Sequence, residues 1–250
     1  MEIKKIGVEM SKIFIASPTY GDVKIEFVNS IINMVNYFNE IGQDHQICFS
    51  KDNAILTDAR NALVTSFLQS DCTHILFIDC DIGFNPESIT DMLETNRSVI
   101  CGMYAKKYIV WERVLNASNK VSLKELSNYV SISNVNLLKD RETEFHSIDD
   151  PVQVDSCGLG FMMVSREVIE KILPNVLTYV VPTNNAFEQK YVSRSEFFKF
   201  DIDRVTHEYV GEDIYFCELI KKYGEASIYL LPSVELAHIG KYSYRCKILL

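Results

Sequence analysis

The sequence predicts an α/β fold in which a mostly parallel, Rossmann-like sheet is flanked by helices. Over about the first 100 residues, short apolar runs alternate with longer segments whose apolar residues follow helical spacing. Strands and helices that alternate in this way form right-handed crossovers within one sheet. The chain has 250 residues, 47% of them hydrophobic, which is enough to bury a sizeable core. Because neither a repeat nor a linker-like segment interrupts it, we expect a single domain over residues 1–250.

The elements of the amino-terminal part are expected in a regular order. Each strand is a short apolar run followed by turn residues, and His74–Asp79 is almost wholly apolar, as in a strand covered on both faces. Glycine after residue 41 should end the first helix, and Asn85 and Pro86 should begin the third as its N-cap and first residue. The expected strands are Lys12–Ser17, Gln46–Ser50, His74–Asp79 and Ser98–Tyr104, and the expected helices span about 22–41, 55–67 and 86–93.

The pattern weakens after Lys106. Residues 106–153 are polar and carry Trp111, with a possible helix near Leu123–Val130. The later elements are expected to be a strand at Gly158–Ser165 and a helix at Arg166–Leu173 capped by Ser165. After a loop with Pro182 should come a strand at Phe197–Asp201, a helix at Glu212–Tyr223 and a strand at Ser227–Leu231, with His238 in the tail.

Charge and cysteine content exclude several classes of protein. The 25 Lys+Arg against 34 Asp+Glu give a net charge of −9, which argues against non-specific nucleic-acid binding. No apolar run approaches the roughly 18 residues of a membrane span, and no signal peptide is expected. The 7 cysteines are scattered without a C-x-x-C pair. They predict reduced thiols and a cytoplasmic protein.

The most informative motif is Asp79-Cys80-Asp81, at the exit of the apolar strand. Alternate residues of an extended chain point the same way, so both carboxylates can converge on one ligand. Open α/β sheets bind ligands at the carboxyl ends of their strands. Two hard oxygen ligands without a Cys/His cluster suit Mg²⁺ or Mn²⁺. The alternative is an acidic turn in which Asp81 caps the following segment.

Other polar residues are expected at the same edge of the sheet. The turn Pro18-Thr19-Tyr20 follows the first strand and presents an aromatic ring that can stack on a base. Asp58, Arg60 and Asn61 begin the second helix, where an arginine can pair with phosphate or with a carboxylate of the D-x-D. A plain turn and a solvated helix face are the alternatives.

Three features of the carboxyl-terminal part carry possible chemistry. Gly158 and Gly160 would let the backbone approach a ligand closely, although they form no dinucleotide fingerprint. Asp213 of the Glu212-Asp213 pair is a candidate general base, unless these acids only complement a helix dipole. His238 can offer a neutral imidazole nitrogen as a third metal ligand, or lie in an exposed loop.

Taken in order, several segments resemble the GT-A-fold glycosyltransferases, in particular family-2-like members and Anp1-type mannosyltransferases. They are P-T-Y, D-A-R-N-A-L-V, I-L-F-I-D-C-D-I-G-F, C-G-M-Y-A-K-K, G-L-G-F-M-M-V-S-R, Y-V-G-E-D-I-Y-F-C and H-I-G. The resemblance covers about Lys12 to Tyr242. It implies a nucleotide-sugar half at about 12–105 and an acceptor half at about 106–242, with the variable stretch 106–153 recognising the acceptor.

The resemblance also implies roles for individual residues. Asp79, Asp81 and His238 would hold Mn²⁺ or Mg²⁺, with Asp79 also on the ribose. Glu212 and Asp213 would lie near the acceptor, with Asp213 the base if the enzyme inverts configuration; Anp1-type enzymes retain it, so the stereochemistry stays open. The residues expected to bind the nucleotide-sugar are Pro18, Thr19, Tyr20, Asp58, Arg60, Asn61, Asp79, Gly158 and Gly160.

The implied activity is metal-dependent transfer of a sugar from a UDP- or GDP-sugar to a hydroxyl of a glycan, lipid-linked or protein acceptor. A non-catalytic nucleotide-sugar or glycan binding module is the alternative. A D-x-D phosphatase is less favoured, because its motif opens the first strand and here Ile82-Gly83 follow the second aspartate. Nucleotidylyltransferases are disfavoured because the turn at Pro18 lacks their glycine-rich loop.

Overall fold

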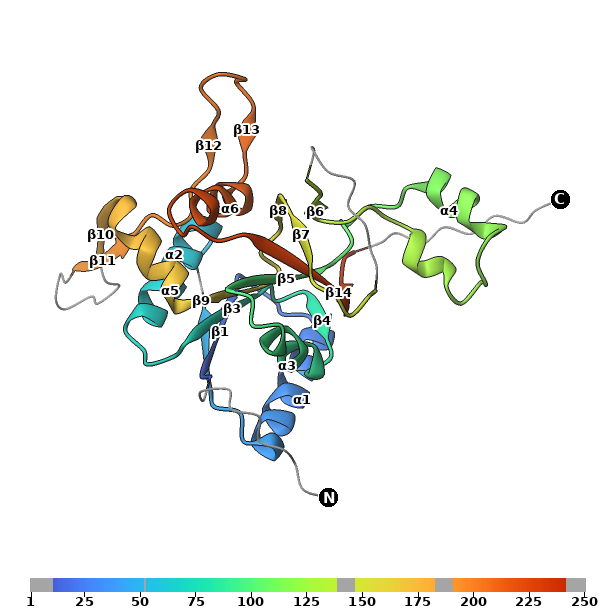
Figure 1. Ribbon diagram of the computed structural model, residues 1–250, viewed down its shortest axis with the longest axis horizontal. Helices are drawn as coiled ribbons and strands as arrows, with labels where there is room; N and C mark the ends of the chain where they lie inside the picture. Colours follow the sequence, from blue (N-terminus) through green and yellow to red (C-terminus); the bar gives the residue numbers. More distant parts are fainter. Residues whose placement is uncertain (1–10, 52, 139–146, 183–190, 242–250) are drawn as a thin grey trace.

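The computed structural model describes residues 11–51, 53–138, 147–182 and 191–241. Its centre is an eight-stranded sheet in the order β2-β1-β3-β9-β5-β14-β4, with β7 paired to β14 (Figure 1). Five strands, β2, β1, β3, β5 and β14, run in one direction, and β9, β4 and β7 run in the other. The strands are β1 (Ile13–Pro18), β2 (His45–Ser50), β3 (His74–Ile78), β4 (Ile82–Phe84), β5 (Val99–Met103), β7 (Val152–Val154), β9 (Phe161–Ser165) and β14 (Ile228–His238). The predicted mostly parallel α/β sheet is therefore confirmed.

Helices cover both faces of this sheet. They are α1 (Ile25–Ile41), α2 (Leu56–Leu68), α3 (Glu87–Glu94), α4 (Trp111–Ser118), α5 (Arg166–Ile172) and α6 (Glu212–Lys222). Helices α1 and α3 pack on one face, and α2, α5 and α6 pack on the other (Figure 1). Two 3₁₀ turns, η1 (Leu126–Tyr129) and η2 (Leu173–Asn175), complete the helical elements of the described residues.

The alternation of side chains along β3 explains why both layers form. Leu76 and Ile78 point to the α1/α3 layer, while Ile75 and Phe77 point to the other. Phe77 meets the ring of Phe216 on α6 edge-on, with centroids 6.0 Å apart. Burying one such side chain stabilises the fold by about 1.5–3 kcal/mol. The almost wholly apolar sequence of this strand follows from its position between two helical layers.

Most predicted elements are found, with shifts at their ends. Gly42 ends α1 in a left-handed conformation, φ 73°, and its N–H donates to the Phe38 carbonyl. Helix α3 begins one residue later than expected, with Pro86 rather than Asn85 at its N-cap position. Ser165 precedes α5, but its hydroxyl makes no capping hydrogen bond and has no partner among the described residues.

Four expectations for the carboxyl-terminal half were wrong. Phe197–Asp201 is not a strand, because Phe197 and Phe198 are buried side chains of an irregular segment. Pro182 was expected in a loop, but it is the last residue of a strand that pairs antiparallel with Tyr191–Ser195. Residues 183–190 lie outside the described part of the chain. Only a 3₁₀ turn lies within Leu123–Val130, while α4 was not expected. The last strand continues to His238, which is therefore in the sheet and not in a tail.

Three short ribbons project from the main sheet. They are β10 (Thr178–Pro182) with β11 (Tyr191–Ser195), β12 (Asp201–Ile202) with β13 (Tyr209–Val210), and β6 (Val135–Asn136) with β8 (Ser156–Cys157). Helix α4 and η1 form a further arm, which lies to the right of the sheet in Figure 1. Among the described residues, no helix is both long and apolar enough to cross a membrane.

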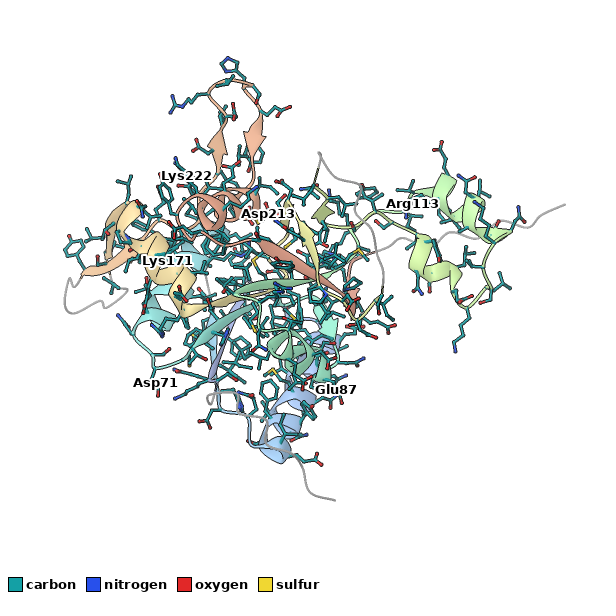
Figure 2. All side chains as sticks on the ribbon, viewed as in Figure 1. Asp71, Glu87, Arg113, Lys171, Asp213 and Lys222 are labelled. Atoms are coloured by element: carbon teal, nitrogen blue, oxygen red, sulfur yellow. The ribbon has the colours of Figure 1, made fainter. Side chains whose placement is uncertain are left out.

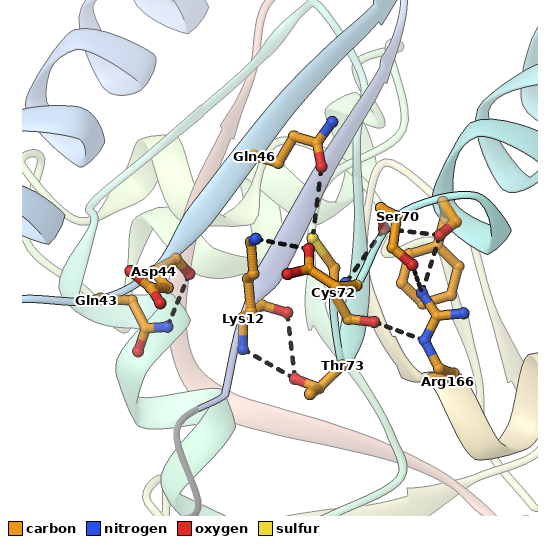
Figure 3. Close-up of polar contacts among 10 residues, drawn as sticks. Lys12, Gln43, Asp44, Gln46, Ser70, Cys72, Thr73 and Arg166 are labelled. Carbon is orange, nitrogen blue, oxygen red and sulfur yellow. Dashed lines mark hydrogen bonds and ion pairs between the residues drawn. The ribbon is translucent and has the colours of Figure 1, made fainter.

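The amino ends of the central strands are joined by a network of side chains and backbone groups (Figure 3). Arg166 donates to the carbonyls of Phe67, Ser70 and Cys72 at 2.9, 3.0 and 2.7 Å. Its guanidinium lies over the Phe67 ring, 4.4 Å from the centroid. Because Phe67 is in the last turn of α2 and Ser70 and Cys72 follow it, Arg166 fixes the end of that helix against the start of β3. This edge of the sheet is a structural joint.

Candidate active site

Asp79 and Asp81 follow β3 at the opposite edge of the sheet, and strand pairing brings His238 to them. Strand β4, directly after Asp81, pairs antiparallel with the end of β14, so that Ile82 faces His238. The Ile239 N–H donates to the Asp81 carbonyl at 2.8 Å. As a result the Nε2 of His238 lies 3.4 Å from Oδ1 of Asp81. Two predicted metal ligands that are far apart in the sequence are thus adjacent.

The hydrogen bonds of His238 define which ring nitrogen is available. Its Nδ1 lies 2.7 Å from the carbonyl oxygen of Ala105, which can only accept, so the Nδ1–H donates. The ring is also packed edge-on against Tyr104, with centroids 5.1 Å apart. When the imidazole is neutral, Nε2 presents a lone pair to a carboxylate oxygen of Asp81. Two acceptors that face each other require a cation or a proton between them, and this donor set fits Mn²⁺ or Mg²⁺.

The third predicted metal ligand does not join them. Oδ1 of Asp79 accepts from the guanidinium of Arg60 at 2.9 Å. Among the described residues, no three His, Cys, Asp or Glu side chains are gathered closely enough to hold a metal ion. The side chains therefore divide into two groups, with Asp81 and His238 in one and Asp79 in the other.

Lys107 is a close neighbour of Asp81, and it is one of the two lysines, with Lys106, expected to offer positive charge to an anionic donor. Its ammonium forms an ion pair with Oδ2 of Asp81, and its aliphatic stem lies against Gly240. Burial raises the pKa of Asp81, but the hydrogen bonds that a protonated His238 and Lys107 donate more than offset this, and the pKa is lowered. The Asp81 carboxylate is thus ionised at neutral pH.

Arg60 is the buried centre of the second group. It lies on α2, is 2% exposed, and donates to Asp79 and to Oε1 of Glu212, the latter at 2.5 Å. Burial lowers the pKa of Arg60, but the two carboxylates outweigh burial and raise it. The expected pairing of Arg60 with a D-x-D carboxylate is therefore observed. Its Nε has no partner within the described residues.

Asn61 and Asp58 make contacts that hold the protein itself. Asn61 is 3% exposed, and its carboxamide bonds both the N–H and the carbonyl of Phe198, at 2.9 and 3.1 Å. Asp58 accepts from the Tyr179 hydroxyl at 3.0 Å and pairs with Arg194. Burial raises the pKa of Asp58, but these donors, with Asn53, lower it overall. Both residues fasten α2 to the irregular segment and hairpin that follow it in the fold.

The close approach expected at the two glycines is to a side chain of the protein. A Cβ on Gly160 would lie 2.7 Å from Cζ of Tyr104, and one on Gly158 would overlap the Tyr104 hydroxyl. The Gly160 N–H donates to that hydroxyl at 3.0 Å, and the Gly160 carbonyl accepts from the Asp79 N–H at 3.0 Å. Burial, with the nearby Asp79, raises the pKa of Tyr104. Tyr104 therefore connects the backbone of Asp79 with the ring of His238.

A cleft of about 240 Å³ opens beside these groups. The predicted turn Pro18-Thr19-Tyr20 forms one wall, and Asp79, Asp81 and His238 form another. The Tyr20 side chain is 68% exposed, while Thr19 is held by its N–H to the Ser50 carbonyl at 2.8 Å. The sequence therefore predicted the two walls, because the ends of β1 and β3 meet at one edge of a parallel sheet.

The two acids at the start of α6 have different surroundings. Glu212 is joined to Arg60, whereas Oδ1 of Asp213 accepts from the next backbone N–H, that of Ile214, at 2.8 Å. Figure 2 shows Asp213 at the start of α6, above the sheet. Neither acid is among the residues that line the cleft. Of the two, Glu212 is connected to the D-x-D.

One residue of the site, Tyr104, was missed as a candidate. It lies in the segment Y-A-K-K after β5, which the resemblance includes and which also holds Lys107. The only signal for Tyr104 was its position after a strand of the same direction as β3. Its role depends on contacts with Gly160 and His238, more than 50 positions away, which a single sequence does not reveal.

No family model matches the chain, and no curated protein is similar to it in sequence. Among solved structures, the protein A197 from STIV is similar over 93% of this chain and 87% of its own, with a TM-score of 0.50 and 19% identity. The catalytic domain of Drosophila beta1,4galactosyltransferase 7, in complex with xylobiose, is similar over 92% of this chain and 71% of its own, with a TM-score of 0.48 and 13% identity. GalNAc-T7, with UDP, GalNAc and Mn²⁺, is similar over 93% of this chain and 44% of its own, with a TM-score of 0.46 and 8% identity. Identities this low concern the fold alone, and the TM-score of 0.50 indicates that this chain shares its overall fold with A197.

Proposed function

We propose that the protein is a metal-dependent glycosyltransferase that moves a sugar from a UDP- or GDP-sugar to a hydroxyl of an acceptor. The observation that carries this proposal is the arrangement of Asp79, Asp81 and His238 around one cleft at the carboxyl ends of β1 and β3. An open α/β sheet binds its ligand at this edge. Residues 1–250 would act as one catalytic domain, and the half-buried and buried free thiols suit a reducing, cytoplasmic location.

Asp81 and His238 would hold a divalent ion, and Asp79, which pairs with Arg60 in this structure, would have to turn toward them to join the site. When bound, such an ion neutralises the charge that a leaving nucleoside diphosphate develops. Lys107 would release Asp81 and pair its ammonium with the diphosphate, because the Asp81 carboxylate and the diphosphate compete for that ammonium. Tyr20 would stack on the base, and Pro18 and Thr19 would fix the wall behind it.

Arg60 would hold Asp79 and Glu212 in one orientation as a positioning residue. The buried guanidinium lies between the two carboxylates and donates to each, which fixes their orientation. Asp58 and Asn61 would act in the same way, through α2. We retain Asp213 as the proposed base of an inverting reaction, and Glu212 as the acid whose contacts reach the D-x-D.

A thermal-shift screen of nucleoside diphosphates and their sugars, each with and without Mn²⁺, tests the proposal. A ligand that binds only the folded protein stabilises it by about 2.7 kcal/mol at a hundredfold excess over its dissociation constant. We expect a shift for one nucleotide that requires Mn²⁺ and is lost in Asp81→Asn. The absence of any metal-linked shift would contradict the proposal. Donor binding without transfer or hydrolysis would instead identify a binding module.

A further inference from the structure

A second and larger cleft lies against the same end of β14. Its volume is about 840 Å³, compared with about 240 Å³ for the cleft at the D-x-D, and His238 lines both. Helix α1 forms one wall, β4 and the end of β14 form the floor, and the arm of α4 and η1 forms the other wall. Figure 1 shows this arm extending from the sheet beside β4 and β14. The two clefts are therefore neighbours that share one imidazole.

Four carboxamides line this second cleft without using their hydrogen-bonding groups inside the protein. They are Asn29 and Asn33 on α1, Asn85 after β4, and Asn128 in η1. Within the described residues, none of these four side chains makes a hydrogen bond. Each carboxamide offers two donors and an acceptor, which suits a ligand whose groups both donate and accept. Hydroxyl groups have this property, whereas phosphates and carboxylates only accept.

The charge of the cleft excludes an anionic occupant. Glu26 and Glu235 line it, and Arg113 is the single cationic side chain among its lining residues. Figure 2 shows Arg113 on the α4 arm. The floor also carries the side chain of Met103, which is 43% exposed at the end of β5. An exposed apolar side chain among carboxamides matches a molecule with both hydroxyl groups and an apolar C–H face, such as a sugar ring.

We propose that this second cleft binds a neutral oligosaccharide, which is the acceptor of the transfer reaction or the part of it next to the reacting hydroxyl. The inference deepens the proposed function, because a bound glycan is an acceptor only if the protein is a transferase. Binding of the glycan to the cleft can be measured independently of transfer. Sharing His238 places one end of the bound glycan next to the metal ligands. A lipid tail is disfavoured by the four carboxamides, and a nucleotide by the two carboxylates.

The α4 arm would determine which glycan fits. The base of the arm is closed by the Val110 N–H, which donates to the Val130 carbonyl at 2.8 Å, and by the Lys106 N–H, which donates to the Ile132 carbonyl at 2.9 Å. Between these bonds the arm lies outside the sheet and contributes Arg113 and Asn128 to the wall. Its sequence can therefore change without disturbing the core. This location agrees with the expected recognition of the acceptor by residues 106–153.

Titration of the protein with neutral di- to tetrasaccharides, including xylobiose, lactose, chitobiose and mannobiose, tests the inference. Ligand-observed NMR or calorimetry would report binding, with digalacturonate as an anionic comparison. We expect at least one neutral glycan to bind at millimolar concentration or below and digalacturonate to bind more weakly. The double variant Asn33→Ala/Asn85→Ala should weaken that binding about tenfold or more, because each lost hydrogen bond changes affinity several-fold.

The matched control is Asn36→Ala/Asn39→Ala, which removes two exposed carboxamides of α1 outside the cleft. It should change glycan affinity less than about twofold. If no neutral glycan binds, or if both double variants bind equally well, the inference is wrong. Mn²⁺-dependent nucleotide binding is measured on the same samples. Its persistence without glycan binding would reject the cleft alone, and glycan binding without nucleotide binding would reject the transferase proposal.

Discussion

The two ends of β3 are held by two arginines in opposite ways. At the amino end, Arg166 donates to three backbone carbonyls and stacks on an aromatic ring. At the carboxyl end, Arg60 donates to two carboxylates in a buried position. Three of the partners of Arg166 are neutral carbonyls, and its one carboxylate partner, Glu170, is an exposed side chain 3.4 Å away. The two carboxylates around Arg60 leave a net negative charge beside the cleft. One end of β3 therefore stabilises the fold, whereas the other end carries the groups of the candidate site.

Replacing each arginine with methionine gives the largest expected contrast. Arg60→Met would leave the partly buried Asp79 and Glu212 without their cation and should lower the free energy of unfolding by about 3–5 kcal/mol. Arg166→Met should cost about 1–3 kcal/mol, since the carbonyls it leaves are neutral and partly exposed. Urea denaturation of both variants measures this difference. Equal losses would show that the charge of the partners has no influence.

A second variant tests whether unpaired carboxylates cause the loss of stability in Arg60→Met. Arg60→Met/Glu212→Gln removes one of the two unpaired carboxylates, so it should regain part of the lost free energy of unfolding. No recovery would indicate that packing, and not charge, explains the loss.

Asp81→Asn should affect activity far more than stability. The carboxylate is 24% exposed and lies at a strand exit, so its replacement removes little packing. Loss of the carboxylate proposed to bind the metal should reduce the rate of transfer about a hundredfold or more. The free energy of unfolding, measured by urea denaturation, should change by less than about 1 kcal/mol. Donor turnover assayed with Mn²⁺ checks this expectation. Full turnover would remove Asp81 from the site.

Gly160→Ala tests whether Tyr104 requires the glycine. The new methyl group would lie 2.7 Å from the Tyr104 ring, so either the ring or β9 must shift. We expect a loss of about 1–3 kcal/mol in stability, as for other overpacked sites. Gly83→Ala is the matched control, because its methyl group would meet Glu26 and Ala237 at ordinary distances of 3.5 and 3.6 Å. Comparable losses would remove the assigned role of Tyr104.

The smallest effect concerns the response of two aspartates to salt. Asp71, at the amino end of β3, has a pKa lowered by Lys12, and its side chain is 76% exposed. Asp81 is half-buried, and its pKa is lowered despite burial. Salt at about 1 M shortens the Debye length to roughly 3 Å. It should therefore return the pKa of Asp71 toward its usual value of about 3.9 more than that of Asp81.

The sign of the effect on stability follows from the lowered pKa. The Asp81 pairing stabilises the folded state above the unfolded pKa of about 3.9, and this contribution is lost as the pH falls through the lower folded value. NMR titration of the carboxyl carbons at two salt concentrations measures both aspartates. Identical responses to salt would contradict the difference in burial.

These contrasts also show how far the sequence alone leads. The apolar pattern predicted β1, β2, β3 and β5, and the D-x-D predicted the edge at which the cleft lies. The insertion of β9 antiparallel between β3 and β5 was not predicted, because its composition resembles that of a parallel core strand. The length of β14 was underestimated, since Pro232 and Glu235 interrupt its apolar pattern.

For the site residues, too, some contacts were predicted from the sequence and others were not. Arg60 was expected to meet a phosphate or a D-x-D carboxylate, and the contact with Asp79 was one of those two alternatives. Glycine spacing at Gly158 and Gly160 correctly indicated a close approach, but the approaching group is Tyr104 and could not be inferred without the fold. Pairwise contacts between distant segments are decided by packing, which one sequence does not record.

Strand β14 has a consequence for the order in which the protein becomes competent during synthesis. The first residues of β14 pair with β5 and β7, and its last residue, His238, lies beside Asp81. Asp79 and Asp81 leave the ribosome more than 150 residues earlier, as does the turn at Tyr20. A nascent chain therefore carries both carboxylates without the imidazole, which reaches Asp81 only when the sheet receives this strand.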